Sequence, residues 1–199
     1  SSSEPASSSS TPASSAVSSG TVSETITGNV KELSISNSGI QYENMWVKNT
    51  NQNHDIDIGA ELAKEPAVKM KKDGTVQILI YHTHTTEAFA GSSRTQDNSQ
   101  NVVAVGEEIK KQLEAAGFGV VHDTTCHDYP SYNGAYDRSG ETIQRNLEKY
   151  PDIQVTLDVH RDAMGTQDGI RLKPTAMIQG KKAAQIMIIS GCDDDGTLG

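Results

Sequence analysis

The chain has 199 residues, a net charge of -9 at pH 7 and only two cysteines. Nucleic acid and anionic lipid both select a basic protein face, so the acidic balance excludes them as expected partners. Two cysteines are too few for a disulfide scaffold. Because Cys126 and Cys192 lack Cys-x-x-Cys spacing, the sequence also excludes a cysteine-based structural zinc site. Whether the two cysteines form a disulfide is left open.

Residues 1–27 predict a disordered tether. Residues 1–20 are mostly Ser with Ala, Pro and Thr, which cannot bury enough apolar surface to offset the entropy lost on ordering. No run of about 18 apolar residues occurs, and no basic segment precedes an apolar core, so the sequence shows neither a membrane span nor a signal peptide. A tether that begins without an anchor suggests a signal or membrane segment ahead of it; a plain disordered tail is the alternative.

Residues 28–66 predict a small β-rich lobe. Short apolar alternations, around Val30 and Leu33 and again around Trp46 and Val47, are broken by Asn and Gly turns.

From residue 67 to 199 the pattern changes to strand, helix, strand. This predicts an α/β fold with a mostly parallel sheet flanked by helices. The apolar run Val76–Tyr81 reads as a buried strand. Asn98 or Ser99 can cap a helix whose apolar residues recur at three- and four-residue steps, and Gly117 suits its C-terminal end.

The rest of this region continues the alternation. Ser139 is the expected cap of a second helix with Ile143 and Leu147 facing inward, stopped by Pro151. Four further apolar runs bring the expected set to about five strands, of which at least the first three are parallel because helices connect them. These runs are Phe118–Val121, Ile153–Val159, Thr175–Ile178 and Gln185–Ile189.

Histidines and carboxylates follow two of these strands. His84 and Glu87 come just after Val76–Tyr81, and His160 comes just after Ile153–Val159. The carboxyl ends of parallel strands share one edge of a sheet, where α/β proteins build sites. Hydrolytic zinc takes three protein ligands from His, Asp or Glu and keeps one position for water. We therefore expect His84, Glu87 and His160 to bind one zinc ion; a hydrogen-bonded structural group is the alternative.

Neighbouring residues are expected to support these ligands. His82 is interpreted mainly as a residue that orients a ligand, although it could itself be a ligand or only the end of the strand. Asp158 alternates with His160 and could hold it, and Asp162 is a further supporting carboxylate. Asp97, ahead of the first helix, could replace Glu87 as the carboxylate ligand.

Three other residues complete the candidates. Arg161 could fix a substrate carboxylate or stabilise an oxyanion, or be a solvated side chain. His122 and His127 are expected to make local hydrogen bonds in loops. The sequence has no Gly-x-Ser-x-Gly elbow and no Gly-rich phosphate loop ahead of a helix, so serine and nucleotide chemistry are unsupported.

Three motifs, Ile80–Glu87, Val103–Gly106 and Leu157–Ala163, together resemble the stage II sporulation protein P family. The resemblance covers residues 68–199, with a looser similarity at Trp46–Asn49. That family comprises membrane-anchored cell-wall hydrolases of endospore-forming bacteria, similar in fold to zinc N-acetylmuramoyl-L-alanine amidases. Its members act on septal peptidoglycan during engulfment, also cut peptide cross-links, and work beside the stage II sporulation proteins D and M.

The resemblance implies a reaction and a location. A water on zinc held by His84, Glu87 and His160 would attack the amide between muramic acid and L-alanine, and the metal would polarise the carbonyl. The protein would be extracytoplasmic, on the forespore septal or engulfing membrane, and the tether would let it reach the wall.

The family domain continues past Gly199 to a strand with a glutamate that resembles the general base, so we expect the sequence to be incomplete at both ends and a poor hydrolase by itself. The alternatives are a non-catalytic wall-binding or scaffold module and a carboxypeptidase-like zinc peptidase.

Overall fold

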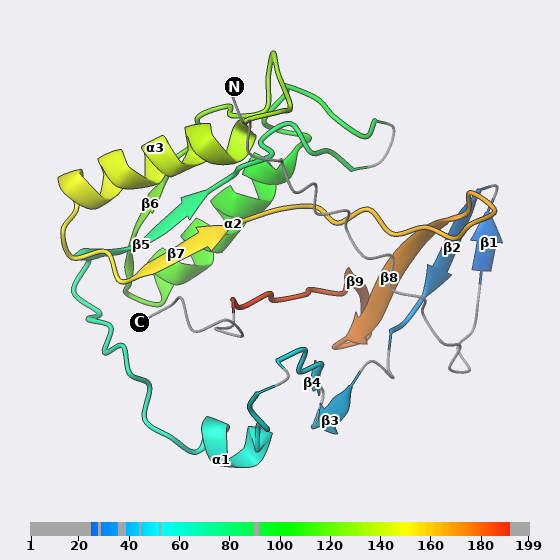
Figure 1. Ribbon diagram of the computed structural model, residues 1–199, viewed down its shortest axis with the longest axis horizontal. Helices are drawn as coiled ribbons and strands as arrows, with labels where there is room; N and C mark the ends of the chain where they lie inside the picture. The colour runs from blue at the N-terminus through cyan, green and yellow to red at the C-terminus, as the bar shows by residue number, and fades with distance from the viewer. Residues whose placement is uncertain are drawn as a thin grey trace, which may run out of the picture. The chain divides into compact units, whose positions relative to one another are not determined.

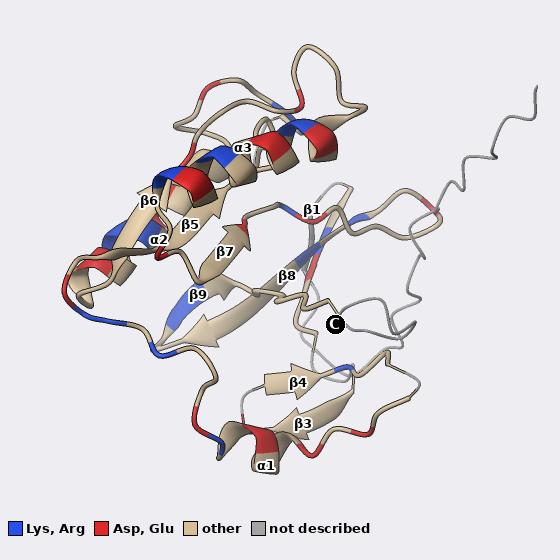
Figure 2. Cartoon of the chain, turned by 60° about the vertical axis from the view of Figure 1, so that its left-hand side comes forward, with Lys and Arg blue, Asp and Glu red and all other residues tan. Residues whose placement is uncertain are grey.

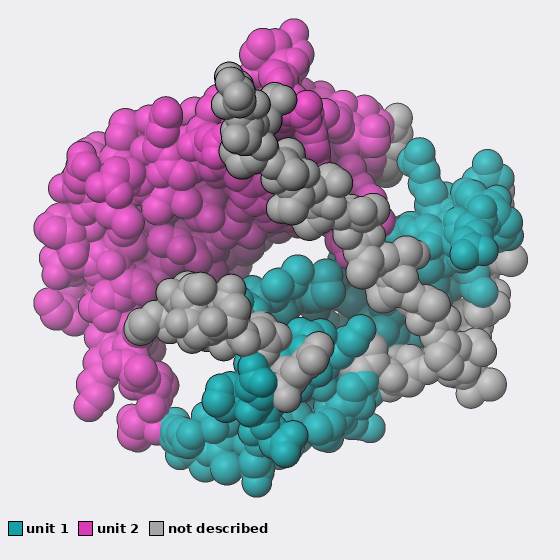
Figure 3. All heavy atoms as spheres, in the orientation of Figure 1, with its two compact units in different colours: residues 1–64, 164–199 teal, residues 65–163 magenta. Residues whose placement is uncertain are grey.

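The computed structural model (Figure 1) describes residues 25–27, 29–35, 39–43, 45–51, 53–89 and 92–191. It divides into two compact units, one of residues 65–163 and one that combines residues 1–64 with 164–199 (Figure 3). We predicted that residues 164–199 belong to the α/β region, but in the structure they group with residues 1–64. Most of the serine-rich tether, Cys192 and the end of the chain lie outside the described residues.

The unit of residues 65–163 is built on a three-stranded parallel sheet. Strand β5 (Val76–Tyr81) lies between β6 (Gly119–His122) and β7 (Val155–Asp158). The register pairs Tyr81 with Asp158. The prediction of an α/β fold whose first three strands in this region are parallel is confirmed.

Helix α2 (Val102–Ala115) covers the apolar face of this sheet. Ile78, Ile80 and Val120 form the buried core, and Ile109 and Leu113 of the helix pack against it. The helix starts later than predicted because the side chain of Asp97 accepts hydrogen bonds from Ser99 and holds that segment in a turn; Asn101 provides the cap instead. At the other end Gly117 has φ 96°, which confirms the predicted left-handed C-terminal position.

Helix α3 (Ala135–Lys149) covers the opposite face and differs more from expectation. It begins one turn before Ser139, which is buried within the helix and hydrogen-bonded to Thr83 rather than acting as a cap. Its buried face is mostly polar, with Ser139, Thr142 and Asn146, whereas Leu147 is 37% exposed. Charged residues of both signs line its outer face (Figure 2).

The second unit contains a four-stranded sheet in the order β1-β2-β8-β9. Its strands are β1 (Thr25–Thr27), β2 (Val30–Leu33), β8 (Arg171–Ile178) and β9 (Lys181–Ala184). A hairpin of β3 (Ile40–Tyr42) and β4 (Met45–Val47) and the short helix α1 (Ile58–Leu62) belong to the same unit.

This arrangement corrects three predictions. Residues 25–27 form a strand instead of belonging to the disordered tether. The run Thr175–Ile178 lies in β8, which pairs with β2 and β9 and not with the central sheet. Gln185–Ile189 is not a strand, because the side chain of Gln185 is hydrogen-bonded to the backbone of Ile35 and the residues after it are exposed.

Across the described ranges, no helix has the length and apolar character needed to cross a membrane.

Candidate functional site

Four side chains meet at the carboxyl ends of β5 and β7: His84, Glu87, Asp158 and His160. The rings of His84 and His160 lie 5.4 Å apart between centroids. Nδ1 of His160 lies 3.5 Å from Oε2 of Glu87, and Nε2 of the same ring lies 2.9 Å from Oδ2 of Asp158. We call these four residues the His–carboxylate cluster.

Backbone and hydroxyl groups fix the two carboxylates. Asp158 accepts hydrogen bonds from the backbone N–H of Thr83 at 2.9 Å and from its hydroxyl at 2.7 Å. Glu87 follows a turn in which its N–H donates to the carbonyl of His84 at 3.0 Å. Its Oε2 accepts the backbone N–H of Arg161 at 2.7 Å. The strand-end segments therefore hold the carboxylates in place through the main chain.

The electrostatics of the two histidines differ. Hydrogen bonding to Asp158 and then to Glu87 raises the pKa of His160 to about 10 against the opposing effect of burial. Burial lowers the pKa of His84, and Nδ1 of its ring has no hydrogen-bond partner although it is buried. A buried imidazole nitrogen without a partner is uncommon and requires an explanation. A bound cation would be a partner for this nitrogen.

The cluster can be tested for its fit to zinc. Within the described ranges, no three His, Cys, Asp or Glu side chains are arranged to hold a metal ion as they stand. The donor types are nevertheless those that zinc selects, and two zinc ligands at a tetrahedral angle lie roughly 3.3–3.6 Å apart. The 3.5 Å between His160 and Glu87 falls in that range. The buried Nδ1 of His84, which has no hydrogen-bond partner, is a further donor of a type that zinc selects.

His82 lies behind the cluster. Its Nδ1 donates to the carbonyl of Val159 at 2.9 Å, so it fixes the backbone just ahead of His160. Its Nε2 lies 2.8 Å from Nε2 of His122, whose Nδ1 lies 3.1 Å from Glu107. Burial lowers the pKa of His82 to about 4. The structure thus links His82 by hydrogen bonds to the backbone of Val159, just after β7, and to His122, and not to a side chain of the cluster.

Three other candidates lie elsewhere. Asp97 is exposed and accepts hydrogen bonds from Ser99 and Gln100, so of the two carboxylates considered as ligands the structure brings Glu87 to the histidines. Asp162 is exposed and accepts the N–H of Ala163. His127 is buried and hydrogen-bonded to Thr142 and to the carbonyl of His82.

Arg161 lies at the edge of the cluster. Its backbone N–H contacts Glu87, and Nη2 of its guanidinium donates to the carbonyl of Ser93 at 2.8 Å. Nε of the same group is buried without a hydrogen-bond partner. The side chain therefore bridges the loop around Ser93 and the end of β7.

The site contains two aromatic residues that were not predicted from the sequence. Tyr132 stacks on His84 with ring centroids 4.3 Å apart and planes 2° apart, and Tyr136 meets the same ring edge-on at 5.3 Å. Tyr132 precedes α3 and Tyr136 lies in its first turn. No local sequence signal connects them to His84, which lies about 50 residues earlier; only the crowding of tyrosines between residues 129 and 136 was visible.

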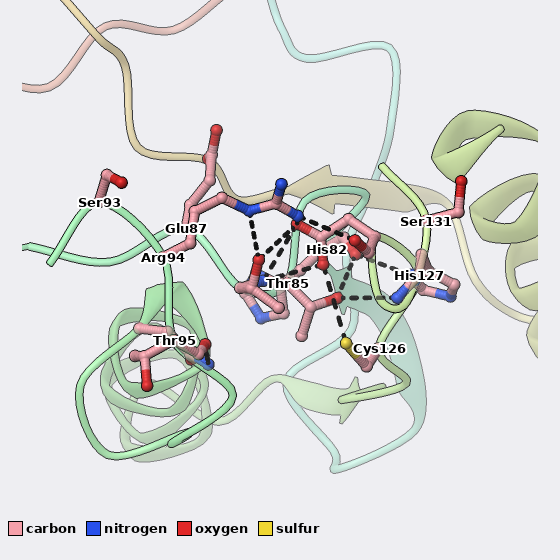
Figure 4. A network of polar contacts seen from close by, with 12 residues as sticks. His82, Thr85, Glu87, Ser93, Arg94, Thr95, Cys126, His127 and Ser131 are labelled. Carbon is pink, nitrogen blue, oxygen red and sulfur yellow. Dashed lines mark hydrogen bonds and ion pairs between the residues drawn. The ribbon is translucent and has the colours of Figure 1, made fainter. Parts of the chain in front are cut away.

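A buried polar network supports the loop that carries His84 (Figure 4). Arg94 donates to Thr86 at 2.8 Å and pairs with Asp128 at 2.9 Å, and Asp128 also accepts the hydroxyl of Thr86 at 2.8 Å. Thr85 donates to the carbonyl of His82 at 2.9 Å. The side chain of Asp128 is 0% exposed, so Arg94 supplies the positive charge that a buried carboxylate requires.

Fold and site together define an α/β protein with histidines and carboxylates at the carboxyl edge of a parallel sheet, the edge at which such proteins bind ligands. The chain matches the family model of the Stage II sporulation protein P over residues 4–196, and it belongs to that family. The resemblance noted in the sequence is thereby confirmed, and membership gives the chain a role in sporulation.

A curated relative is the Stage II sporulation protein P of Bacillus subtilis (strain 168), which is 28% identical over 143 residues. That match covers 64% of this chain and 34% of the relative, so the chain spans about a third of the relative's length. No solved structure matches the chain.

Proposed function

We propose that this chain is the zinc-dependent part of a peptidoglycan hydrolase that cleaves the amide between N-acetylmuramic acid and L-alanine, and also peptide cross-links, during engulfment. The observation that carries the proposal is the convergence of His84, Glu87 and His160 at one sheet edge in a chain of a sporulation family. Clusters of this composition beyond parallel strands are suited to metal-assisted hydrolysis.

Each residue of the cluster has a proposed role. His84, Glu87 and His160 would hold zinc, which when bound supplies a water of lowered pKa and polarises a carbonyl. Asp158, fixed by its two hydrogen bonds from Thr83, orients the imidazole of His160.

Arg161 has two separate functions in this proposal. Its backbone N–H orients Glu87, and its guanidinium binds a carboxylate of the stem peptide. That role requires the guanidinium to exchange its contact with the carbonyl of Ser93 for the substrate.

The proposal includes a location and partners. The protein would act outside the cytoplasmic membrane, anchored to the septal or engulfing membrane of the forespore. It would work beside the stage II sporulation proteins D and M on septal peptidoglycan. The family membership supports the sporulation setting.

The experiment compares the new chemical groups that the full-length protein releases from purified cell wall. Amidase action gives a free lactyl carboxyl and a free L-alanine amine, whereas peptidase action gives amines within the stem. We expect L-alanine amines from the wild type, at least about 100-fold fewer from Glu87→Gln and His160→Ala, and no change for the control Asp97→Ala. Zinc-loaded protein that releases no L-alanine amine would refute the amidase assignment.

A further inference from the structure

Three exposed tyrosines lie close together in the sequence, and two of them, Tyr132 and Tyr136, contact His84 of the His–carboxylate cluster. Three of the six tyrosines of the chain fall within eight residues, at positions 129, 132 and 136. They are 59%, 50% and 66% exposed, respectively. An aromatic ring that remains exposed to water does not contribute its hydrophobic free energy to folding. Exposed aromatic groups beside a site commonly contact a ligand.

Two of these rings touch the cluster directly. Tyr132 stacks on His84 and Tyr136 meets it edge-on with an interplanar angle of 85°. Because one face of Tyr132 lies against His84, Tyr136 has the larger free surface of the pair. Both residues belong to the unit of residues 65–163 that carries the whole cluster.

A contact within the protein holds the ring of Tyr132. The guanidinium of Arg94 lies 4.8 Å from the centre of its ring, a cation–π contact. Arg94 is in turn held by the buried carboxylate of Asp128 at 2.9 Å and by Thr86. A surface that is ordered before binding loses less conformational entropy on binding, so this ring is prepared for contact.

The exposed ring of Tyr136 suits a ligand group that has an apolar face and a polar edge. A pyranose ring has this character, because it can pack its C–H face on an aromatic face and use its hydroxyl and acetamido groups for hydrogen bonds. In peptidoglycan the glycan strand offers such rings, and the carboxylates belong to the stem.

We propose that Tyr132 and Tyr136 form a sugar-binding subsite that stacks an N-acetylhexosamine ring of the glycan strand next to the His–carboxylate cluster. This inference rests on the proposed function for its choice of ligand. It also orients the substrate, since the glycan lies toward the start of α3 and the stem peptide toward Arg161. Tyr136 supplies the main stacking surface and Tyr132 the adjoining wall.

The test measures binding of a tetramer of N-acetylglucosamine to the full-length protein by calorimetry. The tetramer has no muramyl amide, so its binding does not depend on hydrolysis. Tyr136→Ala should weaken binding roughly three- to tenfold, the usual value of one aromatic contact. Tyr136→Phe keeps the ring and should bind within about twofold of the wild type. Tyr129→Ala is the matched control, an exposed tyrosine of the same segment, and should bind like the wild type.

The outcomes separate this inference from the proposed function. Tyrosine-dependent binding in a protein that cleaves no wall would support the subsite and count against the hydrolase. Wall cleavage with unchanged tetramer binding in Tyr136→Ala and Tyr132→Ala would overturn the subsite, as would a wild type that does not bind the tetramer at millimolar concentration. Zinc affinity is measured in parallel: a Tyr132→Ala protein that loses zinc but keeps the sugar would show that Tyr132 positions His84 instead.

Discussion

Replacing Gly106 with alanine is expected to destabilise the unit of residues 65–163, although alanine is the better helix former. Gly106 is buried in α2. A Cβ atom added there would lie 2.6 Å from Nε2 of His122 and 2.8 Å from Nε2 of His82. Real Cβ atoms do not approach other heavy atoms so closely, so the two imidazoles would have to move. They are buried and hydrogen-bonded to each other at 2.8 Å, which leaves them little freedom to do so.

The opposing contributions can be compared. Alanine in place of glycine gains about 1 kcal/mol of helix propensity. Extra volume in a packed interior costs about 1–3 kcal/mol, and a buried polar group left without its partner costs about 1–3 kcal/mol. The expected net loss for Gly106→Ala is therefore about 1–5 kcal/mol, compared with a total stability of about 5–15 kcal/mol for a typical domain.

Gly140 provides the matched control. It lies in α3, and a Cβ atom added there would meet nothing within 4 Å. Gly140→Ala should therefore increase stability by about 0.5–1 kcal/mol. Urea unfolding followed by circular dichroism at 222 nm reports mainly on α2 and α3, the two long helices of the described residues. Two variants that both stabilise the protein would refute the steric argument about His82 and His122.

Three further predictions concern the site. Asp158→Asn should lower zinc affinity about 10–100-fold in a competition assay, because Asp158 orients His160. The control Asp162→Asn should leave zinc affinity unchanged. Equal zinc affinities of the two variants would show that Asp158 does not contribute to zinc binding. Arg161→Lys in the full-length protein should raise KM for cell wall with little change in thermal stability, since lysine keeps the charge and loses the bidentate geometry; unchanged kinetics would exclude substrate binding by Arg161. Arg94→Ala should cost about 2 kcal/mol in urea unfolding because it leaves the buried Asp128 without its cation, and wild-type stability would show that the pair contributes nothing.

The parts of the fold that were predictable are those with a local hydrophobic pattern. The run Val76–Tyr81 was recognisable as a buried strand, and the three- and four-residue steps ending at Gly117 identified α2, because both elements bury apolar residues in one regular pattern. The same reasoning placed His84 and His160 at one sheet edge, where the structure has them. Such patterns predict which strands are parallel, so a site at their shared carboxyl edge can be anticipated.

The start of α3 could not be predicted in this way. The helix buries Ser139, Thr142 and Asn146, whose partners are polar groups of distant segments, so its inward face has no apolar period. A serine in such a sequence resembles a cap, because serine is common at helix N-termini. The contacts of Tyr132 and Tyr136 with His84 depend on the placement of this helix, and they were missed for the same reason.

The assignment of the last strands failed for another reason. Thr175–Ile178 has the composition of a strand, but composition does not determine which strands it pairs with. In the structure β8 takes β2 as a parallel partner and β9 as an antiparallel one. The exposure of residues such as Ile186 and Ile188, at 89% and 90%, could not be inferred from a segment so rich in apolar residues.

The polar face of α3 sets where its first turn lies. Three hydrogen bonds of 2.8 Å secure it, from Ser139 to Thr83, from Thr142 to His127 and from Asn146 to Asp123. An apolar interface can shift along its axis at modest cost, but a displacement of one turn, about 5.4 Å, would break all three of these bonds together. The helix thus has one permitted axial position. The end that carries Tyr136 is held to that position by contacts lying well away from the ring itself.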